Sequence, residues 1–513
     1  MNSNRGARRG VLAQAVGPVL LVFCALLVGA GWSLASPPGS APDDNWHLPS
    51  IWCAPGSSAV HCAMVPDHPE QRIVPSEVSG STCFVQDPTK SGACQYDMDG
   101  KLVLDAPTTT GNWLHSYPPA FYIFMHRFIT GDFYASILLM RLANVFLTVA
   151  SIGLLAWLVP RRLRAVATVP VLLTSIPLGL SLLASTNPSS WTYFSAATLW
   201  VALYASFEVE GRRRWGLWAL ALVMAVTGSG SRADSALFCV MAVGLVLLLR
   251  LPLLLRHKST LLVMAGCVAI AAVFFITAGQ ATAVSDGFVA APPPTPVFGL
   301  TIANIQQLPV LWFGSLGFGF MGSIGWLDTV FPPLLTFFTL GAWAGVVFAA
   351  LRVQSWFKLA GLAALAFAIT IYPLYLLAKS HLPVGQGFQP RYVLPILVIL
   401  TGVALLPVAH DRVRLSRTQA LVAAFALSLA QLIALYTQIR RYVTGTDRSG
   451  FDLDKGREWW WLPAVPATAV WLIASAAFAV LCVAVFTTLT RVPDDAPRRR
   501  VAEPRETAQE QPS

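Results

Sequence analysis

The chain has 513 residues, of which 55% are hydrophobic and only 12% are charged, and its net charge is +10. A soluble domain carries about 25% charged residues, so this composition excludes an ordinary soluble fold. The basic residues stand in short clusters between apolar runs, which excludes a nucleic-acid-binding face. The sequence contains neither a Walker A motif nor a Rossmann fingerprint, which excludes the usual ATP-driven pump and dinucleotide-dependent enzyme.

The N-terminal stretch predicts a short cytoplasmic segment, residues 1–10, and a first transmembrane helix over residues 11–31. Arg5, Arg8 and Arg9 precede the apolar run. A run of about 20 apolar residues is long enough to span a bilayer. We therefore expect a retained signal anchor with a cytoplasmic N-terminus, and a cleaved signal peptide is the alternative.

A long polar segment, residues 32–135, predicts a large extracytoplasmic loop that ends in an interfacial helix over residues 118–129. Four cysteines of this loop predict two disulfides with three possible pairings: Cys53, Cys62, Cys83 and Cys94. Disulfides indicate an oxidising compartment, whereas the alternative, a zinc site, lacks CxxC spacing here. The other four cysteines lie in apolar runs and are expected to be buried hydrophobes: Cys24, Cys239, Cys267 and Cys482.

Residues 136–490 predict a transmembrane bundle with an outer loop at residues 280–329. The expected spans are 136–158, 165–184, 190–207, 215–230, 235–255, 260–279, 330–350, 357–378, 391–409, 418–437 and 465–488. Alternate loops are basic, as the positive-inside rule requires when both termini are cytoplasmic. Within the outer loop, residues 298–322 are expected to be re-entrant or interfacial. Residues 491–513 predict a disordered cytoplasmic tail. The fold class is thus all-α and polytopic, with about twelve transmembrane helices.

Two adjacent carboxylates are the candidate catalytic groups. Asp43 and Asp44 lie about a dozen residues past the first predicted span, near the outer membrane surface. A carboxylate there suits a general base for a sugar hydroxyl, or a ligand for a divalent cation that binds a phosphate. His47 shares a helical face with Asp43, which suits a metal ion or a proton relay. The alternative is an N-cap on a short helix that Pro49 limits.

Charged residues at the predicted outer ends of helices are candidates for substrate binding. Arg232 and Asp234 either pair with each other, or Arg232 binds a lipid phosphate. Arg391, next to Gln389, starts a helix on the side where positive-inside logic disfavours a cation. This position indicates that Arg391 grips a phosphate or pyrophosphate, and an interfacial Arg–Tyr anchor is the alternative.

Trp326 and Asp328 end the predicted outer loop in a glycine-rich run. An aromatic face beside a carboxylate suits stacking on a sugar ring. The alternative is that Asp328 caps the next helix across Pro332.

Four short motifs resemble, in the same order, those of the bacterial membrane family called "domain of unknown function 2142". They are Asn187-Pro188-Ser189, Ser231-Arg232, Gly325-Trp326-Leu327-Asp328-Thr329 and Gln389-Pro390-Arg391-Tyr392-Val393-Leu394-Pro395. The resemblance covers most of residues 30–410. Ser189 stands where the family usually has Asp, Pro390 where it has Gly, and Tyr117 where it often has His.

The layout of that family is similar to the GT-C glycosyltransferases, which use polyprenyl-phosphate sugar donors. This resemblance implies a glycosyltransferase in the bacterial plasma membrane that transfers a sugar to an envelope glycan on the outer face. Asp43 or Asp44 then acts as base or metal ligand, and Arg391 with Arg232 stabilises the leaving lipid phosphate. The implied partners are membrane lipid, a polyprenyl-phosphate-linked sugar and a glycan acceptor. A flippase for a lipid-linked glycan and a non-catalytic envelope assembly protein are the alternatives.

Overall fold

The computed structural model describes residues 3–57, 60–279, 297–409 and 411–490. The predicted disordered tail at 491–513 and the first part of the predicted outer loop, residues 280–296, lie outside these ranges.

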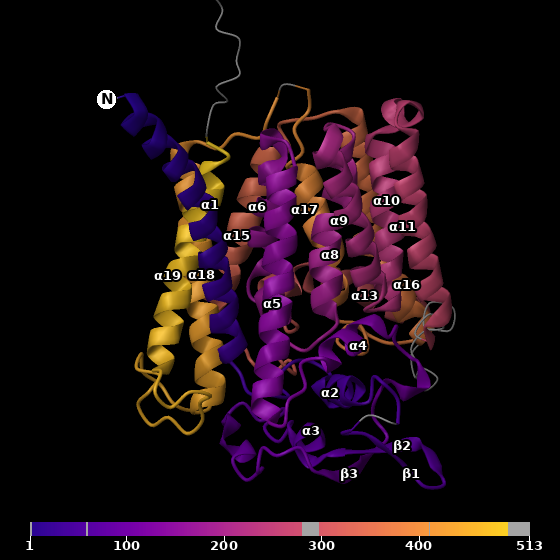
Figure 1. Cartoon of the computed structure of the whole chain (residues 1–513), viewed down its shortest axis with the longest axis vertical. Helices are drawn as coiled ribbons and strands as arrows, with labels where there is room; N and C mark the ends of the chain where they lie inside the picture. Colours follow the sequence, from indigo (N-terminus) through magenta and orange to yellow (C-terminus); the bar gives the residue numbers. More distant parts are fainter. Residues whose placement is uncertain (1–2, 58–59, 280–296, 410, 491–513) are drawn as a thin grey trace, which may run out of the picture.

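The described residues form a bundle of long helices with a smaller domain at one end (Figure 1). The helices of the bundle are α1 (Ser3–Leu34), α5 (Phe133–Leu158), α6 (Arg164–Ser175), α7 (Leu178–Leu183), α8 (Ser189–Ser206), α9 (Gly211–Ser229), α10 (Ala233–Leu249), α11 (Lys258–Thr277), α13 (Val297–Gln306), α14 (Leu308–Phe313), α15 (Pro333–Ala350), α16 (Trp356–Ser380), α17 (Leu394–Ala404), α18 (Arg417–Val443) and α19 (Ala467–Thr487). The smaller domain consists of residues 35–132, which we call the outer domain.

Seven of the described helices are long and apolar enough to cross a membrane, so the protein is a multi-pass membrane protein. They are the part of α1 from Gly17 to Leu34, α5, α11, α15, α16, α18 and α19. The other predicted spans also coincide with helices, but α10 and α17 are shorter apolar helices. The prediction of one continuous helix over 165–184 is wrong. The chain breaks into α6 and α7 at Pro177, whose ring cannot donate a helical hydrogen bond. That about twelve segments cross the membrane stays a prediction.

Helix α8 lies at the centre of the bundle, because every residue from Ser189 to Ser206 is buried. A helix that is covered on all sides does not need a lipid-facing stripe, which explains its many Ser and Thr residues. It packs closely on α17 at Gly402. A Cβ atom there would lie 2.4 Å from the indole of Trp200, so only glycine allows this approach.

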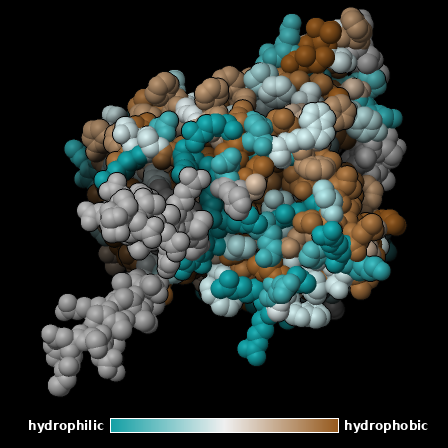
Figure 2. Space-filling view, turned by 90° about the horizontal axis from the view of Figure 1, so that it is seen from above, coloured by the Kyte–Doolittle hydropathy of each residue, from teal (hydrophilic) through white to brown (hydrophobic). Residues whose placement is uncertain are grey.

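The helices alternate in direction, and one set of ends meets the outer domain. The N–H of Phe121 donates to the carbonyl of Gly230 after α9, and the N–H of Gly279 after α11 donates to that of His115. The basic loops join the opposite ends, as Arg161–Arg164 does between α5 and α6. Viewed from that end, many hydrophilic residues lie across the middle of the face, with hydrophobic residues among and beside them (Figure 2).

The outer domain contains α2 (Asp44–Trp52), α3 (Ser76–Gly80), α4 (Ala120–His126) and a three-stranded antiparallel sheet. The strands are β1 (Ala63–Val65), β2 (His68–Pro75) and β3 (Leu104–Thr108), in the order β1-β2-β3. The all-α prediction is therefore wrong for this domain. The strands are short and largely exposed, so they show no alternating apolar pattern in the sequence. Helix α4 lies within the predicted interfacial helix.

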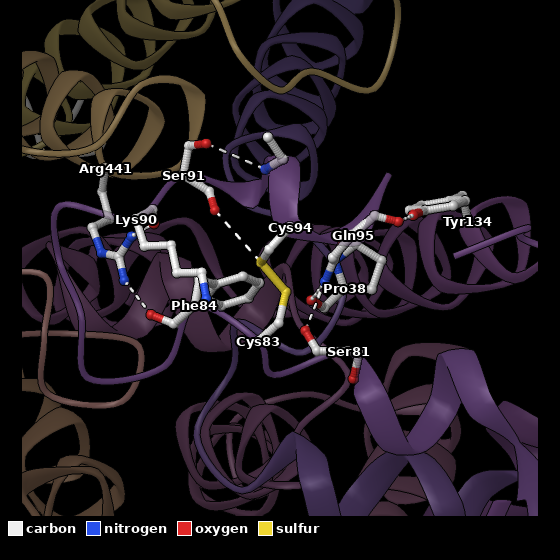
Figure 3. The surroundings of a disulfide bond; sticks show 11 residues. Pro38, Ser81, Cys83, Phe84, Lys90, Ser91, Cys94, Gln95, Tyr134 and Arg441 are labelled. Carbon is white, nitrogen blue, oxygen red and sulfur yellow. Dashed lines mark hydrogen bonds between the residues drawn. A yellow bond between two sulfur atoms is a disulfide. The ribbon is translucent and has the colours of Figure 1, made fainter. Parts of the chain in front are cut away.

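Two disulfides staple the outer domain, Cys53–Cys62 and Cys83–Cys94, which resolves the three possible pairings. The four other cysteines are free and buried, as predicted. Figure 3 shows that the second disulfide lies between two anchoring side chains. Arg441 of α18 donates to the carbonyls of Lys90 and Phe84 at 2.6 and 2.9 Å. Gln95 donates to the carbonyls of Pro38 and Ser81 at 2.8 and 2.6 Å. The disulfide loop therefore joins α18 to the segment that leads to Asp43.

The predicted re-entrant segment, residues 298–322, forms no single long helix but the short helices α13 and α14 followed by a 3₁₀ turn. Asn304 donates to the carbonyl of Leu382, beyond the outer end of α16. Trp312 then donates to the carbonyl of Ile369, about half-way along α16. The segment therefore runs from the outer end of α16 to about its middle, as a re-entrant segment would. The re-entrant assignment itself stays a prediction.

We predict that Gly402→Val destabilises the protein by about 1–3 kcal/mol, because the added methyl groups overlap the Trp200 ring. Gly345→Val is the matched control, since nothing lies within 4 Å of a Cβ at that helical position. Thermal unfolding in detergent measures the difference. Equal melting temperatures of the two variants would show that α8 and α17 do not pack in this way.

Candidate functional site

Asp43 lies in the turn between α1 and α2 and has an unusual backbone conformation. Its φ is +59°, in the left-handed region, which aspartate tolerates better than most residues. Its carbonyl oxygen accepts the N–H groups of Trp46 and His47, both at 2.9 Å, and so starts α2. Its side chain makes no capping bond to the helix, so the carboxylate is free to act elsewhere. The expectation that Pro49 limits this helix is wrong, because α2 continues through it to Trp52.

The carboxylate of Asp43 forms an ion pair with Arg391, which lies 348 residues further along the chain. The distance from Arg391 Nη2 to Asp43 Oδ2 is 2.5 Å. The Arg391 side chain is 2% exposed, whereas that of Asp43 is 40% exposed. Burial raises the pKa of the Asp43 carboxyl, but Arg391 and Arg232 together bring it below its ordinary value. Asp43 is therefore ionised at neutral pH and open on one side.

Arg391 lies in the 3₁₀ turn η7 (Pro390–Tyr392), directly before α17. Its Nη2 also donates to the hydroxyl of Tyr392 at 3.0 Å. Its Nε and Nη1 are buried and have no hydrogen-bond partner in the described part of the chain. A guanidinium carries five N–H donors in a planar fork that matches carboxylates and phosphates. The unused donors leave this buried cation able to bind an anion.

Arg232 also lies beside the Tyr392 ring. Its guanidinium is 4.8 Å from the centre of the Tyr392 ring and 5.5 Å from that of Tyr117. It also forms a bidentate ion pair with Asp234, at 2.9 and 3.0 Å. The first of the two readings of this pair is thus confirmed: the residues pair with each other. The two arginines and their rings form one continuous cluster.

His47 adds a neutral polar group to the cluster. Its Nδ1 shares a 3.0 Å hydrogen bond with the Tyr122 hydroxyl, and its ring meets the Tyr117 ring edge-on at 5.6 Å. Burial lowers the pKa of His47 to about 3, so the imidazole is uncharged at neutral pH. Its Nε2 is buried and has no partner among the described residues. We call Asp43, His47, Tyr117, Arg232, Arg391 and Tyr392 the Asp43–Arg391 cluster.

Asp44 has a different environment from its neighbour Asp43. Its side chain is fully buried and accepts the Thr186 hydroxyl at 2.8 Å and the Ala41 N–H at 3.0 Å. Asn187 donates at 2.7 Å to the carbonyl of Pro42. Burial raises the pKa of the Asp44 carboxyl to about 6. These contacts fix the turn on both sides of Asp43, so Asp44 positions the carboxylate that faces Arg391.

The structure reveals one charged residue that our sequence reasoning missed, Arg141. Its guanidinium lies inside the apolar helix α5 and is 1% exposed. It donates to the carbonyls of Ser33, Ser36 and Pro37 at 2.9, 2.6 and 2.8 Å, and thereby caps the end of α1. An arginine eight residues inside an apolar span is itself a signal of a special role, and could have been recognised.

Trp326 and Asp328 lie outside the Asp43–Arg391 cluster. Asp328 accepts Arg441 Nη2 at 3.0 Å and the N–H of Gln86 at 3.2 Å, and Trp326 donates to the carbonyl of Gly39 at 2.9 Å. The expectation that Asp328 caps the next helix is wrong, because no side chain caps α15. Gln389 is half-buried, and its backbone carbonyl accepts the N–H of Tyr392. Their roles in substrate binding stay predictions.

The described residues do not form a set of protein ligands for a metal ion. Within them, no group of three or more His, Cys, Asp or Glu residues lies close enough together to hold an ion. Asp43 and His47 share the cluster, but His47 presents Nδ1 to Tyr122. Any divalent cation here needs ligands from a substrate, as Mg²⁺ often has from phosphates.

A comparison with protein-family models finds one match, described as "Predicted membrane protein (DUF2142)", over residues 26–400. This range contains every residue of the Asp43–Arg391 cluster and all four sequence motifs. The search of curated proteins finds no match.

We predict that Asp44→Asn changes the pH dependence of stability. A carboxyl whose pKa is raised on folding, from 3.8 to about 6, contributes stability that is fully present below pH 4 and lost as pH rises through 6. The free energy of unfolding of the unmodified protein should therefore fall by roughly 2–3 kcal/mol at most between pH 4 and pH 7, and its melting temperature should fall with it. Asp44→Asn should flatten this slope. A slope that persists in the variant would remove Asp44 as its origin.

Proposed function

The chain belongs to the membrane-protein family called domain of unknown function 2142, and from this premise we propose that it is a glycosyltransferase of the bacterial plasma membrane. It transfers a sugar from a polyprenyl-phosphate donor to an envelope glycan on the outer face. The observation that carries the proposal is the 2.5 Å contact between a half-open carboxylate and a buried arginine with spare donors. The carboxylate serves as the base, and the arginine serves as the phosphate site.

The proposed reaction moves one proton and exchanges one bond. The acceptor hydroxyl oxygen attacks the anomeric carbon of the donor sugar, and Asp43 takes the hydroxyl proton. The bond between the anomeric carbon and the phosphate oxygen breaks at the same time. The departing polyprenyl phosphate gains negative charge, which Arg391 stabilises through N–H groups that no described residue uses. Arg232, held rigid by Asp234, adds a second positive charge close by.

The outer location is supported by the chemistry of the domain that carries Asp43. Two disulfides lie in this domain, and such bonds persist in oxidising compartments outside the cytoplasm. The basic loops join the opposite ends of the helices, where the positive-inside rule expects the cytoplasm. Both termini are then cytoplasmic. Nucleotide sugars are absent from this side, which agrees with the lack of a Rossmann fingerprint.

A flippase and an assembly protein remain the alternatives to test. A flippase needs charges within its spans that are free to meet the substrate. Two buried charges inside the bundle, Arg141 and Lys358, are instead bonded to backbone carbonyls. We therefore favour transfer. Accumulation of the lipid-linked sugar on the inner leaflet of a deletion strain would favour the flippase.

We predict that Asp43→Asn lowers transfer at least 100-fold, since an amide cannot accept the hydroxyl proton and a general base contributes 10²–10⁴-fold. The readout is the envelope glycan profile of a deletion strain that carries the variant, with protein abundance measured in its membranes. Asp105→Asn is the matched control and should retain the activity, because Asp105 is exposed on β3 of the outer domain and is not part of the Asp43–Arg391 cluster. Full complementation by Asp43→Asn would falsify the catalytic assignment.

We predict that Arg391→Lys weakens donor use more than it weakens folding. Lysine keeps the charge that pairs with Asp43 but loses the planar fork, so the apparent KM for the lipid donor should rise about tenfold or more. Arg391→Gln should lose activity further. Assays with and without a chelator determine whether a divalent cation takes part. An unchanged KM in Arg391→Lys would place the phosphate elsewhere.

A further inference from the structure

A long apolar groove runs between five helices on one side of the bundle, α1, α5, α6, α7 and α19. Its volume is about 410 Å³, within the range of ligand pockets. On α1 it extends from Pro18 to Gly29, a rise of about 17 Å along a helix. Most of its lining side chains are apolar, among them Val149, Leu172 and Leu481. Such a groove suits one hydrocarbon chain lying along the membrane normal.

The outer end of the groove adjoins the segment that holds the Asp43 turn. Leu183 and Ala184 of the groove wall lead directly into Ser185–Asn187. Thr186 and Asn187 in turn bond Asp44 and the carbonyl of Pro42, the two neighbours of Asp43. A lipid chain in the groove therefore ends beside the same short segment that positions the proposed base.

Gly153 of α5 gives the groove its width at one point. Nothing lies within 4 Å of the position that a Cβ would occupy on Gly153, although this residue lines the groove. By contrast, a Cβ on Gly29, also in the wall, would lie 2.2 Å from Val145. Gly29 thus serves close helix packing, whereas Gly153 faces open space that a larger side chain would fill.

We propose that this groove binds the isoprenoid chain of the lipid-linked sugar donor, an inference that rests on the proposed function. A polyprenyl phosphate carries a single hydrocarbon chain, which matches one groove of this volume, whereas a phospholipid carries two. Because lipid tails are as apolar as the groove, the binding energy comes from van der Waals packing of the isoprenoid chain against fixed side chains. The groove then holds the donor laterally in the membrane while its phosphate lies at the outer surface.

The test is photocrosslinking of the full-length protein in nanodiscs with a diazirine-bearing polyprenyl phosphate that carries no sugar. We expect labelled peptides from α1, α5, α6, α7 or α19, and at least a fivefold loss of labelling in Gly153→Phe. Gly244→Phe is the matched control, because Gly244 also has open space around its Cβ but lies on α10 outside the groove. It should label like the unmodified protein.

Three results would overturn the proposal: labelling elsewhere in the bundle, equal labelling of Gly153→Phe, or equal labelling of the groove by a diazirine-bearing phosphatidylglycerol. The last result means that the groove holds ordinary phospholipid. Because the probe has no sugar and the readout is not transfer, this experiment is independent of Asp43. Groove labelling together with an active Asp43→Asn variant would refute the catalytic proposal and leave lipid binding intact.

Discussion

The guanidinium of Arg391 is almost completely buried, and the carboxylate of Asp43 is the acid that pairs with it. A buried cation is costly unless an anion lies close to it, so this pair constrains everything around it. The turn must hold Asp43 at +59° in φ, which costs conformational energy. The bonds of Asp44 and Asn187 on either side of Asp43 offset that cost. The site thus depends on neighbours that do not themselves face the cluster.

Other buried arginines fasten the outer domain to the bundle in the same way. Arg141 donates hydrogen bonds to carbonyls at the end of α1. Arg441 donates to carbonyls of the disulfide loop and forms an ion pair with Asp328. In each case two guanidinium nitrogens donate to different acceptors, a planar arrangement of donors that a lysine does not have. These bonds fix the outer domain on the helix ends. A site built from residues 348 positions apart requires such fixed elements.

The sequence predicted those features that depend on local pattern. Apolar runs between basic loops located the helices, and the four clustered cysteines of the outer domain form two disulfides. The break at Pro177 and the small sheet were missed, because burial inside the protein and short exposed strands leave weak periodicity. That Asp43 and Arg391 lie close together was expected only because both were given roles in the same proposed reaction. No spacing rule joins residues so distant, and the same limit explains why the contacts of Trp326 with Gly39 and of Asp328 with Arg441 were not foreseen.

The ion pair and the proposed phosphate site compete for one cation. A phosphate bound to Arg391 weakens the attraction between the guanidinium and Asp43, because it supplies the negative charge that the carboxylate now supplies. The pKa of Asp43, held low mainly by Arg391 against the effect of burial, then rises towards a value useful for a general base. Asp44 does not share this coupling, since its partners are Thr186 and a backbone N–H. Adjacent aspartates can therefore have separate tasks: one remains fixed, and the other becomes a stronger base when the donor arrives.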